Sequence, residues 1–110
     1  NIKEINGIKV LSKRVEIENP SQLRDLADKF KTKLDSGVLL LGAESNGKAL
    51  LISMVTDDLT KTFKAGNIVK TAAGIVGGGG GGRPDMAQAG GTKPEFLDQA
   101  LESVFETVSK

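Results

Sequence analysis

The first part of the chain alternates apolar and polar residues as β-strands do. Residues 2 to 18, IKEINGIKVLSKRVEIE, are rich in β-branched side chains, and Asn6-Gly7 is typical of the tight turn in a β-hairpin. Along the second strand the apolar residues change phase, because Val10 belongs to one face and Leu11 to the other. This change of phase predicts a β-bulge or a twist near Leu11.

A helical pattern follows these strands. Asn19 can cap a helix, Pro20 suits its first position, and Gln22 can reach back as in a capping box. Apolar residues then recur at helical spacing: Leu23, Leu26, Ala27, Phe30 and Leu34. Gly37 is expected to end this helix.

Two strongly apolar segments come next. VLLLGAE (residues 38–44) and KALLISMV (residues 48–55) flank Ser45-Asn46-Gly47, which predicts a β-hairpin. Because both segments are almost continuously apolar, we expect central strands that are covered on both faces.

The second half begins with a polar, loop-like segment, TDDLTKTFKAG, at residues 56–66. Residues 67–76, NIVKTAAGIV, predict a short apolar helix that runs into six consecutive glycines. After the glycines, Thr92 and Glu95 have the spacing of a second capping box. An apolar stripe then predicts an amphipathic last helix: Phe96, Leu97, Ala100, Leu101, Val104, Phe105 and Val108.

This order of elements predicts an α/β or α+β fold, a mixed β-sheet with about three helices packed on it. A length of 110 residues suits a single domain, and 38% hydrophobic residues suffice for one core. The 4% of aromatic residues are all phenylalanine, so the core is expected to be aliphatic. Because the chain starts at Asn1 without an initiator methionine, we expect residues 1–110 to be a domain excised from a longer protein.

Charge is unevenly distributed along the chain. Residues 1–58 balance nine basic against nine acidic side chains, and residues 94–110 carry a net charge of −3. Residues 59–93, which contain the glycines, hold five basic side chains and one acidic one, a net charge of +4. Such a local excess can hold a phosphate backbone although the whole chain carries only +1.

The composition also excludes several kinds of chemistry. With no cysteine and no histidine, the chain has no disulfide, no thiolate or imidazole metal site, and no cysteine or histidine nucleophile or base. Its apolar runs are shorter than the roughly 18 to 20 residues of a membrane span, and nothing at its start resembles a signal peptide.

The segment GGGGGGRPDMAQAGG, residues 77–91, holds eight of the fourteen glycines. It lacks the Lys-Ser or Lys-Thr of a P-loop, and a predicted helix precedes it where a Rossmann fingerprint needs a strand. Consecutive glycines can still direct several N–H groups into an anion nest, a short helix from Pro84 would add its positive end, and Arg83 suits phosphate. The alternative is a mobile surface loop.

The order AGNIVKTAAGIVGGGGGGRPDMAQAGG, followed by an acidic amphipathic helix, resembles the C-terminal domain of bacterial alanyl-tRNA synthetases. The wider family is the DHH-associated domain, which also occurs in DHH phosphoesterases. The resemblance extends over nearly the whole chain, including NGIKVLSKRVE and LLLGAESNGKALLISMV, and is most specific from Gly66 to Gly91.

The resemblance implies a non-catalytic domain that holds the outer corner of tRNA-Ala and couples the aminoacylation and editing domains of a cytoplasmic alanine–tRNA ligase. Both of those sites lie in upstream domains. No cofactor is therefore expected in this domain, and ATP, magnesium and zinc are expected upstream. The implied partners are tRNA-Ala and the two upstream domains, with a homodimer as a further option and no membrane.

Carried over to this sequence, the motif occupies Gly79, Gly80, Gly81, Gly82, Arg83, Pro84, Asp85, Met86, Gln88, Gly90 and Gly91. Arg83 and the glycine amides are expected to contact the RNA backbone, and Gln88 a base or ribose edge. Charge alone nominates four further residues: Lys61, Lys64, Lys70 and Lys93.

Some of these residues have competing interpretations. Arg83 could instead form a salt bridge with Asp85. Asp85 could cap a short helix or orient Arg83, and Met86 is more often a packing residue. The apolar stripe of the last helix could form a dimer or assembly interface. A phosphate-binding accessory domain is another alternative, because the DHH phosphoesterases carry Gly-Gly-Gly-His at this place. Here Arg83 replaces the histidine and the metal-binding aspartate motif is absent, so anion binding is expected without hydrolysis.

Overall fold

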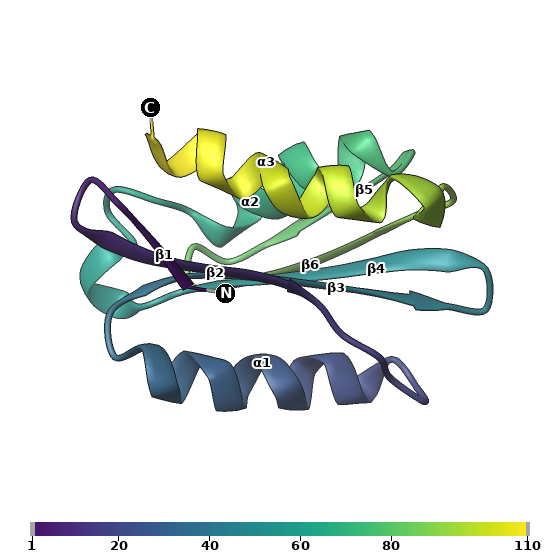
Figure 1. The fold of residues 1–110 in the computed structure, drawn as a ribbon, viewed down its shortest axis with the longest axis horizontal. Coiled ribbons are helices and arrows are strands. Elements are labelled where there is room, and N and C mark those ends of the chain that lie inside the picture. Colours follow the sequence, from purple (N-terminus) through teal and green to yellow (C-terminus); the bar gives the residue numbers. More distant parts are fainter. Residues whose placement is uncertain (1, 110) are drawn as a thin grey trace.

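A six-stranded sheet separates two layers of helices in the computed structural model, which describes residues 2–109 (Figure 1). The strands lie in the order β1-β2-β3-β4-β6-β5, with β2 and β3 parallel and the other neighbours antiparallel. Their bounds are β1 Ile2–Ile5, β2 Ile8–Arg14, β3 Gly37–Ser45, β4 Lys48–Val55, β5 Gly78–Gly82 and β6 Met86–Gly91. The predicted mixed sheet is confirmed.

Three α-helices cover this sheet, as predicted. Helix α1 (Ser21–Leu34) packs on one face, and α2 (Ala65–Ile75) and α3 (Leu97–Ser109) pack on the other (Figure 1). Two short 3-10 helices, η1 (Asp57–Leu59) and η2 (Pro94–Phe96), lie in the connections before α2 and α3. Within residues 2–109, no helix is long and apolar enough to cross a membrane.

Both predicted hairpin turns are confirmed. Asn6 and Gly7 have φ angles of 53° and 81°, and Asn46 and Gly47 have φ angles of 53° and 76°. Positive φ at both central residues is the signature of the type I′ turn, whose twist matches that of the strands that it joins.

The sheet has an apolar core on each face. The core under α1 contains side chains of α1, β3 and β4, and the core on the other face contains side chains of α2, α3 and the same strands. Val10 packs into the second core and Leu11 into the first. The predicted bulge near Leu11 is therefore wrong, because β2 pairs without interruption and its two apolar phases serve two cores.

The end of α1 differs from the prediction. Asp35, with φ and ψ angles of 62° and −64°, makes a γ-turn after the helix, in which the N–H of Ser36 donates to the carbonyl oxygen of Leu34 (2.6 Å). Gly37 is instead the first residue of β3. Gly37 is needed for a different reason. A Cβ atom at this position would lie 2.6 Å from the carbonyl oxygen of Lys9 on the neighbouring strand.

The first predicted capping box does not form. Gln22 does reach back, but its Oε1 accepts the backbone N–H of Glu18 (2.5 Å) and not that of Asn19. The side chain of Asn19 accepts the hydroxyl of Ser21 and caps no backbone N–H. Pro20 lies one position earlier than expected, at the N-cap.

The second predicted capping box is wrong. The hydroxyl of Thr92 is directed to the carbonyl oxygen of Gly77 (3.5 Å), and the chain enters α3 through η2. The apolar stripe of α3 is buried against the sheet, which leaves Phe96 as its exposed member at 40%. The same side chains cannot be buried in the core and also form the dimer interface that was predicted for them. The homodimer itself stays a prediction.

Thr56 fastens the start of β3 to the end of β4. Its buried hydroxyl accepts the N–H of Gly37 (3.0 Å) and is directed to the carbonyl oxygen of the same residue (3.3 Å). Thr56→Val keeps the shape but leaves that N–H unpaired, so we expect the free energy of unfolding to fall by about 1–3 kcal/mol in urea denaturation. The control is Thr32→Val on the exposed side of α1, which should change it by less than about 0.5 kcal/mol. Equal losses in the two variants would contradict this role of Thr56.

Candidate nucleic-acid interface

The glycine-rich segment forms a β-hairpin in which β5 is the edge strand of the sheet. Residues 78–82 pair with residues 87–91 in an antiparallel register, from Gly78 opposite Gly91 to Gly82 opposite Ala87. The interpretations as a loop, as an anion nest and as a helix starting at Pro84 are therefore wrong. The backbone groups that could have formed a nest are instead arranged along a strand.

The fold requires glycine at four of the six consecutive positions. Gly77 has a φ angle of 72° and makes the turn from α2 into β5. A Cβ atom added at Gly78, Gly80 or Gly82 would point into the backbone of β6, so any side chain there would collide with that strand. At Gly80 the nearest atoms, Cα and Cβ of Ala89, would be 2.5 Å away.

The described fold does not require glycine at positions 79 and 81. A Cβ atom at either residue would meet nothing within 4 Å, and neither residue has a positive φ angle. Their cross-strand partners are Gly90 and Gln88, and Gln88 pairs in turn with Ile52, which belongs to the core under α1.

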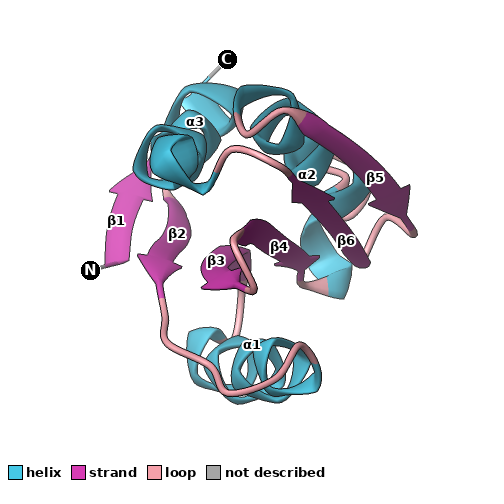
Figure 2. Cartoon of the chain, turned by 90° about the vertical axis from the view of Figure 1, so that its right-hand side faces the viewer, coloured by secondary structure: helices cyan, strands magenta, loops and turns pink. Residues whose placement is uncertain are grey.

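These four residues, Gly79, Gly81, Gln88 and Gly90, form one surface on the α1 side of the sheet, which we call the bare face. Helix α1 packs on β3 and β4, whereas β6 and β5 extend beyond it (Figure 2). The bare face is consequently free of helices, and its one long side chain is Gln88, which is exposed.

The turn after β5 holds Arg83 and Asp85 in a fixed place. The N–H of Arg83 donates to Met86 (2.9 Å), the carbonyl of Pro84 accepts the first N–H of α2, and that of Asp85 accepts an N–H of β4. Nε of Arg83 lies 3.5 Å from Oδ1 of Asp85, which confirms the predicted salt bridge, and 68% of the arginine side chain remains exposed. Asp85 thus positions the guanidinium group and caps no helix.

The other nominated residues differ in how closely they join this hairpin. The aliphatic part of the Lys93 side chain lies over Gly77, at the start of β5, and Arg83 follows the end of β5. Each end of the strand therefore has one basic side chain. Lys64 immediately precedes α2, next to the turn, and donates to the carbonyl of Thr60 (2.7 Å). Lys61 and Lys70 are exposed, in the preceding loop and on α2. None of the four lysines forms an ion pair within residues 2–109.

Two of the nominated residues have structural roles. Met86 is half-buried against the core under α1, as the packing interpretation predicts. A Cβ atom at Gly91 would collide with the backbone of Val76, so this glycine lets α2 approach β6.

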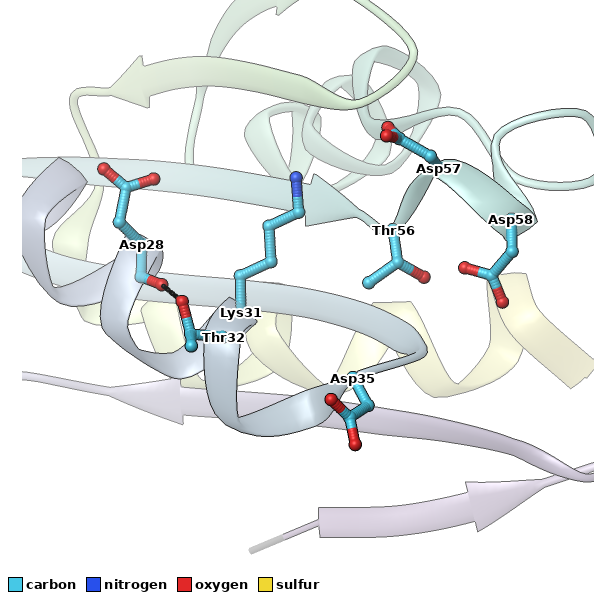
Figure 3. A pocket seen from close by; sticks show the side chains of 7 residues that line it. All are labelled: Asp28, Lys31, Thr32, Asp35, Thr56, Asp57 and Asp58. Atoms are coloured by element: carbon cyan, nitrogen blue, oxygen red, sulfur yellow. Dashed lines mark hydrogen bonds between the residues drawn. The ribbon is translucent and has the colours of Figure 1, made fainter.

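A cavity of about 650 Å³ lies elsewhere, between the end of α1 and η1 (Figure 3). Four aspartates and one lysine line it together with two threonines: Asp28, Lys31, Thr32, Asp35, Thr56, Asp57 and Asp58. The hydroxyl of Ser36 donates to Asp58 and lowers the pKa of that carboxyl group, which keeps it negatively charged. The excess of negative charge repels phosphate, and within residues 2–109 no group of acidic side chains is suited to a metal ion.

The comparisons with known proteins match this architecture. Residues 7–110 match the DHHA1 domain family. The chain belongs to the DHHA1 domain family. This DHHA1 domain is 56% identical, over 98% of its length, to an alanine–tRNA ligase of Desulfosudis oleivorans, and 56% identical, over 94%, to one of Oceanobacillus iheyensis. It spans 12% of the length of each of these enzymes.

Two solved structures share the fold of this DHHA1 domain. The C-Ala domain of Aquifex aeolicus alanyl-tRNA synthetase has a TM-score of 0.89 at 24% identity, with coverage of 100% of this chain and 99% of that one. A DHH-domain protein described as a member of the s1p family of ribosomal proteins has a TM-score of 0.61 at 22% identity, with coverage of 99% of this chain and 28% of that one.

Proposed function

We propose that this DHHA1 domain binds the body of tRNA-Ala as a non-catalytic part of an alanyl-tRNA synthetase. The single observation that carries the proposal is the bare face. No contact or backbone angle within residues 2–109 requires glycine at positions 79 and 81, so a partner that approaches the backbone closely explains them best. The similarity to alanine–tRNA ligases names tRNA as the partner to test first.

The charges around the hairpin support a phosphate-rich partner. Arg83 and Lys93 stand at the two ends of β5, a strand of five residues that is about 17 Å long. The guanidinium of Arg83 is held by Asp85 yet largely exposed, so it can engage a phosphate without a large loss of side-chain entropy. The domain has 4% aromatic residues and therefore no base-stacking platform, which favours recognition of the shape and backbone of folded RNA.

Such binding would assist the enzyme without adding chemistry. A domain that holds the tRNA body keeps the acceptor end near the aminoacylation and editing domains, which raises its effective concentration at both. The domain would in this way couple the two activities. The bare face provides no nucleophile and no general base, because it consists of three glycines and the amide side chain of Gln88.

Gly81→Ala tests the bare face directly. The added methyl group meets open space in the protein, so we expect an unchanged fold, but it should keep RNA from the backbone and weaken tRNA binding by about tenfold. The matched control is Gly74→Ala, an exposed glycine of α2 that also has nothing within 4 Å of a Cβ atom. Fluorescence anisotropy with labelled tRNA-Ala measures both. If both variants bind like the original chain, the bare face is not the contact surface.

A further inference from the structure

Strand β1 forms the edge of the sheet opposite the glycine hairpin, and its outer side is free (Figure 2). In a two-residue hairpin the residues that flank the turn are bonded to each other, and bonded and non-bonded pairs then alternate. Ile5 is the last residue before the turn, so Ile5 and Lys3 are bonded to β2. Glu4 and Ile2 therefore direct their N–H and C=O groups outward, where no other strand of residues 2–109 pairs with them.

An apolar hollow of about 190 Å³ lies beside this edge, between the β1–β2 hairpin and α1. Leu11 of β2 and Phe30 and Leu34 of α1 line it, together with Ile2. Ile2 lies opposite Leu11 in the strand pairing, and 55% of its surface is exposed. An engineered cavity of about 150 Å³ in another protein binds benzene, so this hollow has room for one aromatic ring.

Two lysines complete the lining of the hollow. Nζ of Lys13 lies 5.7 Å from the centre of the Phe30 ring, and this cation–π contact holds the ammonium group beside the hollow. Lys33 is exposed near the end of α1. Neither lysine forms an ion pair in the part of the chain that the structure describes. The complementary occupant therefore has an apolar side chain with carboxylates beside it.

We propose that an extended acidic segment of another protein adds as a strand to β1 and places one apolar side chain in the hollow. In strand addition, main-chain hydrogen bonds to the free edge provide affinity, and pockets beside the edge select alternate side chains. Ile2 and Glu4 provide the main-chain groups. The hollow selects the apolar side chain, and Lys13 and Lys33 select carboxylates on the same face of the added strand. Because β1 and the bare face lie at opposite edges of the sheet, the proposal goes beyond tRNA binding and does not depend on it.

Charge and chemistry disfavour a second copy of the chain and RNA as occupants. Residues 2–13 and Lys33 together carry four lysines and one glutamate, so two copies that pair through β1 would bring like charges together. RNA is attracted by the lysines, but the side chains that line the hollow are otherwise apolar. A base in the hollow would leave its own N–H groups unpaired, which costs free energy.

A designed peptide tests this surface in the ¹⁵N-labelled 110-residue chain. The peptide Thr-Glu-Thr-Phe-Thr-Glu-Thr, with blocked ends, carries phenylalanine and both glutamates on one face of a strand. We expect its addition to move the NMR signal of the Glu4 amide proton downfield, and that of Lys3 much less because its N–H stays bonded to β2. Control peptides with alanine for phenylalanine, or lysine for both glutamates, should bind about tenfold more weakly.

Charge reversal in the chain provides a matched comparison. Lys13→Glu combined with Lys33→Glu should weaken binding of the acidic peptide by at least about tenfold. Lys31→Glu combined with Lys48→Glu changes the net charge equally but outside the hollow, and should weaken it by less than about twofold. Equal weakening in the two double variants would show that total charge alone is measured, and the proposal would fail.

The remaining outcomes identify the other occupants. If the acidic peptide does not bind, if all three peptides bind equally, or if the Glu4 and Lys3 amides shift equally, strand addition at β1 is wrong. A Glu4 shift that grows with protein concentration alone identifies a second copy, and one that appears with tRNA but not with the peptide identifies RNA. A Glu4 amide that is already protected from hydrogen exchange in the intact synthetase identifies an internal segment of that enzyme. Each of these three results overturns the proposal.

Discussion

Gly80→Ala is expected to destabilise the domain far more than Gly81→Ala, although the two residues are neighbours in the same run of glycines. The added Cβ atom at position 80 would lie 2.5 Å from Cα and Cβ of Ala89. These atoms belong to the backbone and the first side-chain atom of β6, so no flexible side chain can move away. We expect a loss of about 3 kcal/mol in the free energy of unfolding, and a fall of more than about 10 °C in Tm.

Gly81→Ala supplies the comparison for this result. Its methyl group enters open space, so the expected change is within about 1 kcal/mol. Thermal unfolding by circular dichroism measures Tm, and amide hydrogen exchange of Gln88 and Gly90, the β6 residues that form bonded pairs with β5, detects local detachment of β5. Equal stability and equal exchange in the two variants would show that β5 is not paired to β6 as described.

Arg83→Ala is expected to weaken tRNA binding and to flatten its dependence on salt. If Arg83 neutralises one phosphate, its removal should lower the slope of log K against log salt by roughly 0.7 to 0.9. Arg83→Lys should recover the slope but only part of the affinity, because an ammonium group cannot contact phosphate through two parallel hydrogen bonds. Filter binding or anisotropy across a salt series gives both quantities.

Arg14→Ala is the matched control for this series. Arg14 is also an exposed arginine with carboxylate partners, Glu44 and Asp98, and its removal changes the net charge equally. It lies on β2, which β3, β4 and β6 separate from β5 in the sheet. The same slope in Arg83→Ala and in the original chain would remove Arg83 from the interface, and an equal change in Arg14→Ala would show that total charge alone is measured.

The elements with a periodic or turn-specific signal could be predicted from the sequence. Asn6-Gly7 and Asn46-Gly47 identified two type I′ hairpins, and the apolar runs after Gly37 identified buried central strands. The phase change at Leu11 could not be interpreted correctly, because a strand covered on both faces needs no polar side and loses its alternation.

The glycine strand could not be predicted in the same way. A run of glycines has no side-chain pattern and low strand propensity, so residues 78–82 carry no local sign of a strand, and the pairing with β6 is a tertiary effect. The family resemblance nominated this segment but assigned one role to all of its glycines. The structure divides them into Gly80, Gly82 and Gly91, which the packing requires, and Gly79 and Gly81, which it does not.

Equilibrium binding of the 110-residue chain to RNA shows whether this domain binds tRNA through its glycine hairpin. The chain would be titrated with tRNA-Ala, an unrelated tRNA and a plain RNA duplex over a salt series. We expect both tRNAs to bind more tightly than the duplex, with an affinity that falls steeply as the salt concentration rises. Binding of the tRNAs no tighter than that of the duplex at every salt concentration would contradict it.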